Sequence, residues 1–244
     1  MTAREDLIAD TFVELADTLV AEFDTIDFLH TLVERTVALL DADAGGIMLA
    51  DQRGGLEVLA ASSHEVRLVE LFELQNHEGP CLEAFRTGEA VTKTDLAEMR
   101  ASWPSFTARL ERAGFASAQA VPMRLREEVI GALNVFRVTP GALSPADMKM
   151  ARALADVATV GLLQERTIRA RERLAEQLQG ALNSRVLIEQ AKGVLAERSG
   201  LEVDQAFTAM RSHARRSGAP LHAVADDIIH GRIGLGPLLG PDRT

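Results

Sequence analysis

Cations near the end of the chain have a spacing that suits a polyanion. Arg185 and Lys192 lie seven residues apart in one predicted helix, and Arg211 and Arg215 lie four apart in the next. Each pair therefore falls on one side of its helix. Arg216 adds a further positive charge. Ordinary solvated surface charges can show the same spacing, so the cations alone leave both interpretations open.

A glycine beside these cations favours the interpretation as a binding surface. Gly193 lies in mid-helix, opposite the apolar stripe, where glycine costs about 1 kcal/mol relative to alanine. Packing does not require it there. A bare helix face beside positive charges lets the backbone of a polyanion approach closely.

Three apolar stripes with helical spacing surround the cations and predict three short helices in residues 185–230. The stripes consist of Leu187, Ile188, Ala191, Val194 and Leu195, then Val203, Ala206, Phe207, Met210 and Ala214, then Leu221, Val224, Ala225 and Ile228. Gly200 and Gly218 are expected to end the first two helices, and Pro220 to open the third.

These helices together resemble the ANTAR domain, a three-helix RNA-binding module of bacterial antiterminators. The resemblance rests on Ile188-x-x-Ala191-Lys192-Gly193-x-Leu195, Ala206-Phe207-x-x-Met210-Arg211-x-x-Ala214 and Leu221-x-x-Val224-Ala225. Ala196 and Glu202 depart from the pattern, where a bulkier residue and a better helix cap are common. The resemblance implies RNA binding by Arg185, Lys192, Gly193, Arg211, Arg215 and Arg216.

The charge of the chain is divided unevenly. Residues 1–165 contain 14 Lys and Arg against 27 Asp and Glu, a net charge of −13, whereas residues 166–244 contain 12 against 9, a net charge of +3. An acidic front part repels RNA, so binding is expected in the last third. The single cysteine, the acidic N-terminus and the lack of a long apolar run predict a cytoplasmic protein without internal disulfides.

The front part alternates between helical and strand patterns. Residues 2–23, 26–41 and 64–76 have helical spacing, and a short helix is expected at 82–86. Strands 45–50 and 56–60 form one predicted hairpin, and strands 117–125 and 129–138 form another. Between them lie a short strand at 90–93 and a long predicted loop around Trp103-Pro104. Pro122 is compatible only with a sheet edge or a bulge.

This order predicts an α+β fold and resembles a GAF domain, of the kind fused to ANTAR modules in actinobacteria. The resemblance rests on Glu78-Gly79-Pro80-Cys81, Trp103-Pro104, Val121-Pro122-Met123 and Ile130-Gly131-Ala132-Leu133-Asn134. GAF domains often bind small molecules between sheet and loops, which implies a ligand pocket lined by Met48, Cys81, Phe85, Trp103 and Phe106. The same side chains would serve equally as core. The cyclic-nucleotide pattern Asn-Lys-x-x-x-Phe does not occur, so any ligand or cofactor is unknown.

A long helix connects the two parts. Ser144-Pro145-Ala146-Asp147 is a good helix start, and the spacing of apolar residues from Val160 to Ala181 approximates that of a coiled coil. We expect a homodimer stalk. The predicted organisation is an N-terminal amphipathic helix (1–23), a GAF-like domain (24–165), a coiled-coil linker helix (166–184), an ANTAR domain (185–231) and a disordered tail (232–244).

The sequence contains no signature of an enzyme. The phosphate-binding loop, the dinucleotide fingerprint, the nucleophile elbow and the His-Glu-x-x-His pattern do not occur, so no catalytic residue is assigned. His77 and Cys81 could in principle ligate a metal or haem iron, but Gly79-Pro80 disrupts a helix that would align them. No metal site is predicted.

Together these patterns predict a GAF and ANTAR domain regulator that captures stem-loops in leader transcripts through paired ANTAR modules. A ligand or dimerisation would act through the GAF domain. Two alternatives remain open at this level. The short connection Ser199-Gly200-Leu201 could belong to a DNA-binding helix-turn-helix, or the C-terminal part could serve only assembly of a small-molecule-binding protein.

Overall fold

The computed structural model describes residues 3–20, 24–51 and 53–239. The chain divides into two compact units, Met1–Arg166 and Thr167–Thr244. One helix, α7 (Pro145–Ser199), contributes its first part to the first unit and the remainder to the second.

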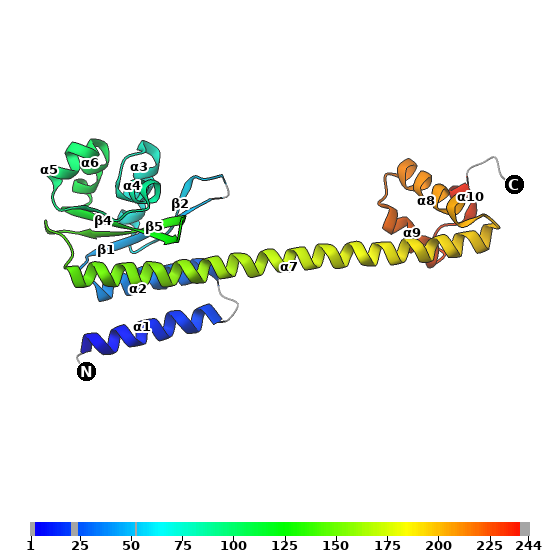
Figure 1. Ribbon diagram of the computed structural model, residues 1–244. Helices are drawn as coiled ribbons and strands as arrows, with labels where there is room; N and C mark the ends of the chain where they lie inside the picture. The colour runs from blue at the N-terminus through cyan, green and yellow to red at the C-terminus, as the bar shows by residue number, and fades with distance from the viewer. Residues whose placement is uncertain (1–2, 21–23, 52, 240–244) are drawn as a thin grey trace. The chain divides into compact units, whose positions relative to one another are not determined.

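In the described part of the chain, a five-stranded antiparallel sheet forms the centre of the first unit, as the sequence predicts (Figure 1). The strands are β1 (Ala44–Ala50), β2 (Leu56–Ala61), β3 (Val91–Lys93), β4 (Ser117–Leu125) and β5 (Glu128–Arg137). They lie in the order β2-β1-β5-β4-β3. Both predicted hairpins are confirmed, because β1 pairs with β2 and β4 pairs with β5, each antiparallel.

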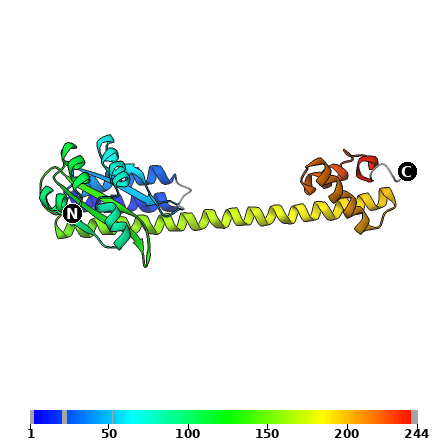
Figure 2. The same ribbon diagram turned by 90° about the horizontal axis from the view of Figure 1, so that it is seen from above.

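Helices cover both faces of this sheet, and each face carries its own apolar core (Figures 1 and 2). Successive side chains of a strand point to opposite faces. Ile47 and Leu133 accordingly pack with α1, α2 and the start of α7, whereas Met48 and Phe136 pack with α3 to α6. The helices are α1 (Ala3–Val20), α2 (Thr25–Leu39), α3 (His64–Asn76), α4 (Pro80–Thr87), α5 (Leu96–Ser102) and α6 (Pro104–Arg112).

The predicted long loop around Trp103 and Pro104 is wrong, because α5 and α6 occupy it. Asp95 caps α5 by accepting the backbone N–H of Glu98 at 2.8 Å. Pro104 lies in the first turn of α6, where its missing N–H costs no intrahelical hydrogen bond. The residues that predict a loop are therefore the caps of two short helices.

Pro122 lies beside a bulge and beyond the end of a short edge strand, as its backbone chemistry requires. β3 pairs only with residues 118–120 of β4, so the side of β4 at Pro122 faces no further strand. The register of the β4 and β5 pair shifts between Met123 and Arg124. A missing N–H is tolerated at such a position.

The start of α7 is also confirmed. The Ser144 hydroxyl oxygen accepts the backbone N–H of Asp147 at 3.1 Å, and Pro145 is the first helical residue. The Asp147 carboxylate also binds the guanidinium of Arg4, which ties α1 to this end of α7.

The second unit consists of the end of α7 with α8 (Val203–Ser217), α9 (Leu221–Ile229) and α10 (Leu235–Leu239). The three predicted helices are confirmed. Gly200 and Gly218 end two of them with φ of 68° and 69°, a left-handed conformation that glycine adopts without a Cβ clash.

The prediction of a disordered tail is wrong for residues 235–239, which form α10. Pro237 is the third residue of this helix, and the N–H groups of a first turn have no intrahelical partner. Leu238 is buried in the apolar core of the second unit. Burial of this leucine stabilises a helix that propensity alone would not form. Residues 240–244 lie outside the described residues.

Candidate nucleic-acid interface

A small apolar core fixes how α7, α8 and α9 present their polar faces. Ala191 and Leu195 of α7 meet Met210 of α8 and Val224 of α9 in one buried cluster. Val203, which the second predicted stripe includes, is exposed because it is the first residue of α8. The cluster leaves the opposite sides of the helices to solvent.

Lys192 joins α7 to α8 at the edge of this core. Its ammonium nitrogen lies 5.5 Å from the ring centroid of Phe207, within cation–π range. The same nitrogen donates to the Glu189 carboxylate at 2.8 Å. Arg211 follows Phe207 by one helical turn, so it lies on the same side of α8. The structure thus places Lys192 against the Phe207 ring, and helical spacing puts Arg211 one turn from that ring on the same side of α8.

Two further arginines extend this surface, which we name the basic flank and define as Arg185, Lys192, Phe207, Arg211 and Arg215. Arg185 precedes Lys192 by seven residues of α7, and Arg215 follows Arg211 by one turn of α8. All three arginines are exposed. Within the described residues, none of them forms an ion pair or a side-chain hydrogen bond. Their guanidinium groups are therefore available to an anion.

Gly193 lies beside the basic flank with open space around it. It is exposed, and a Cβ added there would meet no atom of the described chain within 4 Å. Packing does not explain this glycine.

Arg216 lies on a different side of α8 from Arg211. Five residues of an α-helix turn through about 140°, so the two side chains point away from each other. The Arg216 guanidinium donates to the carbonyl oxygen of Pro237 in α10 at 3.2 Å, and His213 Nδ1 contacts the same oxygen at 3.0 Å. The structure therefore separates Arg216 from the other predicted cations. Sequence reasoning missed this contact because it treated the tail as disordered.

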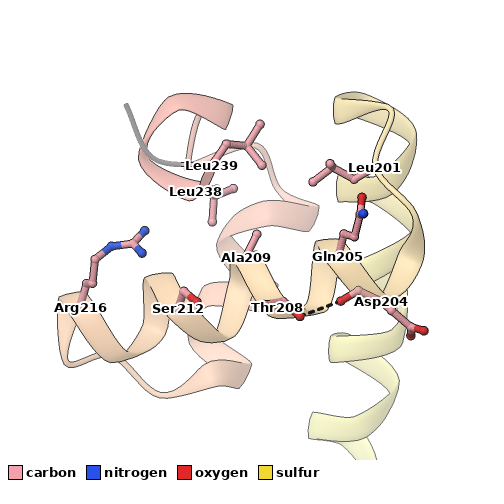
Figure 3. A pocket seen from close by; sticks show the side chains of 9 residues that line it. All are labelled: Leu201, Asp204, Gln205, Thr208, Ala209, Ser212, Arg216, Leu238 and Leu239. Atoms are coloured by element: carbon pink, nitrogen blue, oxygen red, sulfur yellow. Dashed lines mark hydrogen bonds between the residues drawn. The ribbon is translucent and has the colours of Figure 1, made fainter. Parts of the chain in front are cut away.

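A groove lies along the Arg216 side of α8 (Figure 3). Its volume is about 460 Å³. Leu201, Leu238 and Leu239 supply apolar side chains, and the polar lining comes from one side of α8. The α8 residues that line it are Asp204, Gln205, Thr208, Ala209, Ser212 and Arg216. The sequence could not show this groove, because α10 forms one of its walls.

In the first unit, the predicted pocket residues lie in the core between the sheet and α3 to α6. Met48, Cys81, Trp103 and Phe106 belong to one buried cluster, and Phe85 is partly buried. The Trp103 and Phe106 rings meet edge to face with centroids 6.0 Å apart. Burial raises the pKa of the Cys81 thiol well above its ordinary value, so the thiol stays protonated.

Two glutamates that sequence reasoning missed lie beside this core. Glu70 and Glu73 of α3 are fully buried, and the Asn134 amide of β5 donates to both at 3.4 and 3.5 Å. Burial raises the pKa of Glu73 to about 8, and burial with the neighbouring Glu73 raises the pKa of Glu70 well above its ordinary value. The sequence did indicate their burial, because both acids lie on the same helix face as the apolar side chains of Val66 and Val69.

The motif Glu78-Gly79-Pro80-Cys81 connects helices. The Glu78 carboxylate accepts the backbone N–H of Ser105 at 2.8 Å, which caps α6. The Glu73 carboxyl oxygen accepts the N–H of Leu82 at 2.9 Å, in the first turn of α4. Gly79 has a φ of 152°, and a Cβ there would collide with the Glu73 carboxyl. The motif thus has a structural role in joining α3, α4 and α6.

Within the described residues, no three His, Cys, Asp or Glu side chains lie together as metal ligands. None of the described helices is both long enough and apolar enough to cross a bilayer.

Comparison with known proteins divides the chain in the same way. The family model described as GAF domain matches residues 24–162, and the one described as ANTAR domain matches residues 176–229. The search of curated proteins found no match.

Solved structures resemble the first unit. A GAF domain of a phosphoenolpyruvate-protein phosphotransferase from Coxiella burnetii has a TM-score of 0.53 and 16% identity, covering 69% of this chain and 99% of its own. Free methionine-R-sulfoxide reductase from Neisseria meningitidis, solved with its substrate, has a TM-score of 0.52 and 16% identity, covering 69% of this chain and 95% of its own. At these identities the likeness shows the fold alone.

Proposed function

Because this chain belongs to the GAF domain family and also carries an ANTAR domain, we propose that it is an RNA-binding regulator of transcription antitermination. The observation that carries the proposal is the basic flank. It combines Lys192, which lies against the Phe207 ring, with three exposed arginines on α7 and α8, at the edge of a small apolar core. Such a surface offers charge to phosphates and a ring to an unpaired base, the two features by which proteins recognise RNA stem-loops.

The basic flank would bind the RNA as follows. Arg185, Arg211 and Arg215 neutralise phosphates of the stem and loop, and Lys192 contributes once it exchanges Glu189 for a phosphate. Gly193 lets the RNA backbone approach α7 closely. Capture of a leader stem-loop in this way would prevent a competing terminator hairpin from forming. Since transcripts are made in the cytoplasm of bacteria, this is where the protein would act.

Dimerisation through α7 would present two ANTAR modules to two stem-loops. Large apolar side chains are exposed along the part of α7 before the ANTAR core: Ile168, Leu174, Leu178 and Leu182 are each 50–58% exposed. A single helix with such a stripe is marginal in water and favours pairing with a second copy. Pairing raises avidity because the second stem-loop then binds at a high effective concentration.

The GAF domain would control this arrangement, through dimerisation or through an unidentified small molecule. The predicted lining residues pack with one another in the structure, so binding of a ligand there requires displacement of core side chains. We therefore assign Met48, Cys81, Phe85, Trp103 and Phe106 to the same region and name no ligand.

The test compares the full chain with Lys192→Ala/Arg211→Ala in filter binding to a tandem pair of RNA stem-loops, a single stem-loop and duplex DNA. We expect the tandem RNA to bind most tightly and the variant to lose roughly 100-fold in affinity. Arg112→Ala/Arg152→Ala removes the same charge from exposed positions of the first unit and is the control.

Two outcomes would contradict the proposal. Tighter binding to duplex DNA than to RNA would favour the helix-turn-helix alternative. Unchanged RNA affinity of Lys192→Ala/Arg211→Ala would favour a C-terminal part that serves only assembly.

A further inference from the structure

The groove between α8 and α10 combines Arg216 and Asp204, which have opposite charges, with unused hydrogen-bonding groups (Figure 3). Within the described residues, the side chains of Gln205 and Ser212 form no hydrogen bond. Arg216 uses one of its five N–H donors in a hydrogen bond of 3.2 Å to the Pro237 carbonyl oxygen. That bond fixes the guanidinium at one end of the groove and leaves its other donors available.

The groove has an apolar surface as well as this polar one. Leu201, from the connection after α7, and Leu238 and Leu239, from α10, line the groove, and the side chains of Leu201 and Leu239 point toward one another (Figure 3). The Thr208 hydroxyl is already used, because it donates to the backbone carbonyl oxygen of Asp204 at 2.9 Å. The site therefore offers an apolar contact, the Gln205 amide and the Ser212 hydroxyl for a polar edge, and a cation at one end.

An unpaired nucleotide has the complementary chemistry. It carries an anionic phosphate, a base edge with donors and acceptors, and an apolar base face. We infer that the groove holds a nucleotide from the loop of the bound RNA, with its phosphate at Arg216 and its base edge at Gln205 and Ser212. This inference rests on the proposed function. It adds a second contact surface on the side of α8 away from Arg211.

Two other occupants fit less well. A second protein chain would need an interface of roughly 800 Å² on each partner, far more than one groove of this size supplies. A free phosphate would use Arg216 alone and leave the leucines and the amide without a role. The acid Asp204 also opposes a phosphate at its own end of the groove, which orients the nucleotide.

The test uses the full chain and an RNA hairpin selected for tight binding from a pool with a randomised loop. In the variant Gln205→Ala/Ser212→Ala, we expect the Kd for this hairpin to rise by about 10-fold, the effect of losing one base-edge contact. An abasic substitution at the recognised loop position should abolish the difference between the variant and the unchanged protein. Gln177→Ala/Gln190→Ala removes two exposed amides of α7 outside the groove and should bind normally.

A second variant, Ala209→Leu, fills the groove without removing a polar group and should weaken binding similarly. Thermal melts followed by circular dichroism check that each variant is folded. If both groove variants bind RNA normally and Lys192→Ala/Arg211→Ala does not, the inference that the groove holds a nucleotide is wrong and the proposed function stands. The inference is also wrong if the groove variants lose the same affinity for the intact hairpin as for every abasic hairpin. If no variant on either side of α8 changes RNA affinity, the proposed function fails with it.

Discussion

The two units place their ionisable groups in opposite ways. The first unit buries Glu70 and Glu73 beside Asn134 in its interior. Among the described residues, no cation forms an ion pair with either acid. In the second unit, none of the described polar or charged side chains is fully buried, and Arg185, Arg211 and Arg215 are exposed. The first unit should therefore respond to pH through its stability, whereas the second should respond to salt through its ligand.

The two units also differ in how closely their glycines are packed, and this difference gives the largest predicted effect on stability. Gly131 of β5 lies against β1, and a Cβ there would collide with the Met48 carbonyl oxygen, which belongs to the backbone and cannot turn aside. Gly131→Ala should destabilise the first unit by roughly 4 kcal/mol or more, measured by urea unfolding.

Gly193→Ala is the matched control, since open space surrounds that position. It should stabilise α7 by up to about 1 kcal/mol, because alanine has the higher helix propensity. If it also weakens RNA binding, close approach of the RNA backbone explains the glycine. Equal effects of the two substitutions on stability would remove the contrast between the units.

The buried acids give the next largest effect. The pKa of Glu73 is raised to about 8 in the folded chain, from an ordinary value of 4.5. The folded state thus keeps a proton that the unfolded state has lost, so stability is highest below pH 4.5 and falls as pH rises toward 8. From this group alone we expect a loss of roughly 3 kcal/mol between pH 5 and 8.

Glu73→Gln should flatten that dependence, because a neutral amide keeps the carbonyl oxygen that accepts the Leu82 N–H. Urea unfolding of the first unit at several pH values measures it. Glu189→Gln, an exposed acid of α7, should leave the profile unchanged. A profile that rises between pH 5 and 8 in the unsubstituted chain would contradict a raised pKa of Glu73.

Local patterns were enough for the hairpins and the helix ends. Strand-like runs on either side of the turns at 51–55 and 126–128 predicted both hairpins, and the glycines at 200 and 218 predicted helix ends, because these signals depend on neighbours in the sequence. The candidate cations on the basic flank were found for the same reason, since helical spacing alone puts them on one side.

Tertiary contacts decided what the sequence missed. Leu238 makes α10 a helix by entering a core that no local pattern reveals, and the groove exists only because α10 is there. Glu70 and Glu73 occupy positions where the helical pattern shows a buried face, but acids at such positions are ordinarily read as solvated. Trp103 and Pro104 were interpreted as loop residues, although Trp103 follows the end of α5 and Pro104 begins α6.

The core of the second unit is small, so shortening a single buried side chain should remove a large share of its stability. Leu238→Ala removes a side chain that is 2% exposed and should cost about 2 kcal/mol, with α10 released from α8. In thermal unfolding of the full chain, the transition of the second unit should move to a lower temperature, whereas that of the first unit should not change. Leu235→Ala, at an exposed position of the same helix, is the control. An unchanged melt for Leu238→Ala would restore the prediction of a tail that does not contribute to the fold.

The smallest effect concerns the one cation of the basic flank that already has an anionic partner. Lys192 donates to both oxygens of Glu189, at 2.8 and 3.1 Å, so RNA must compete with this carboxylate. The Glu189 side chain is 58% exposed, so solvent screens this ion pair, which contributes only about 0–1 kcal/mol to stability, and Glu189→Gln should barely change the melting temperature. It should, however, tighten RNA binding by roughly 3-fold at low salt, because it removes a negative charge and frees the ammonium group. Glu197→Gln, an exposed acid two turns further along α7, should have a smaller effect. If Glu189→Gln instead weakens binding, Glu189 positions Lys192 over Phe207, and the ion pair is part of the interface.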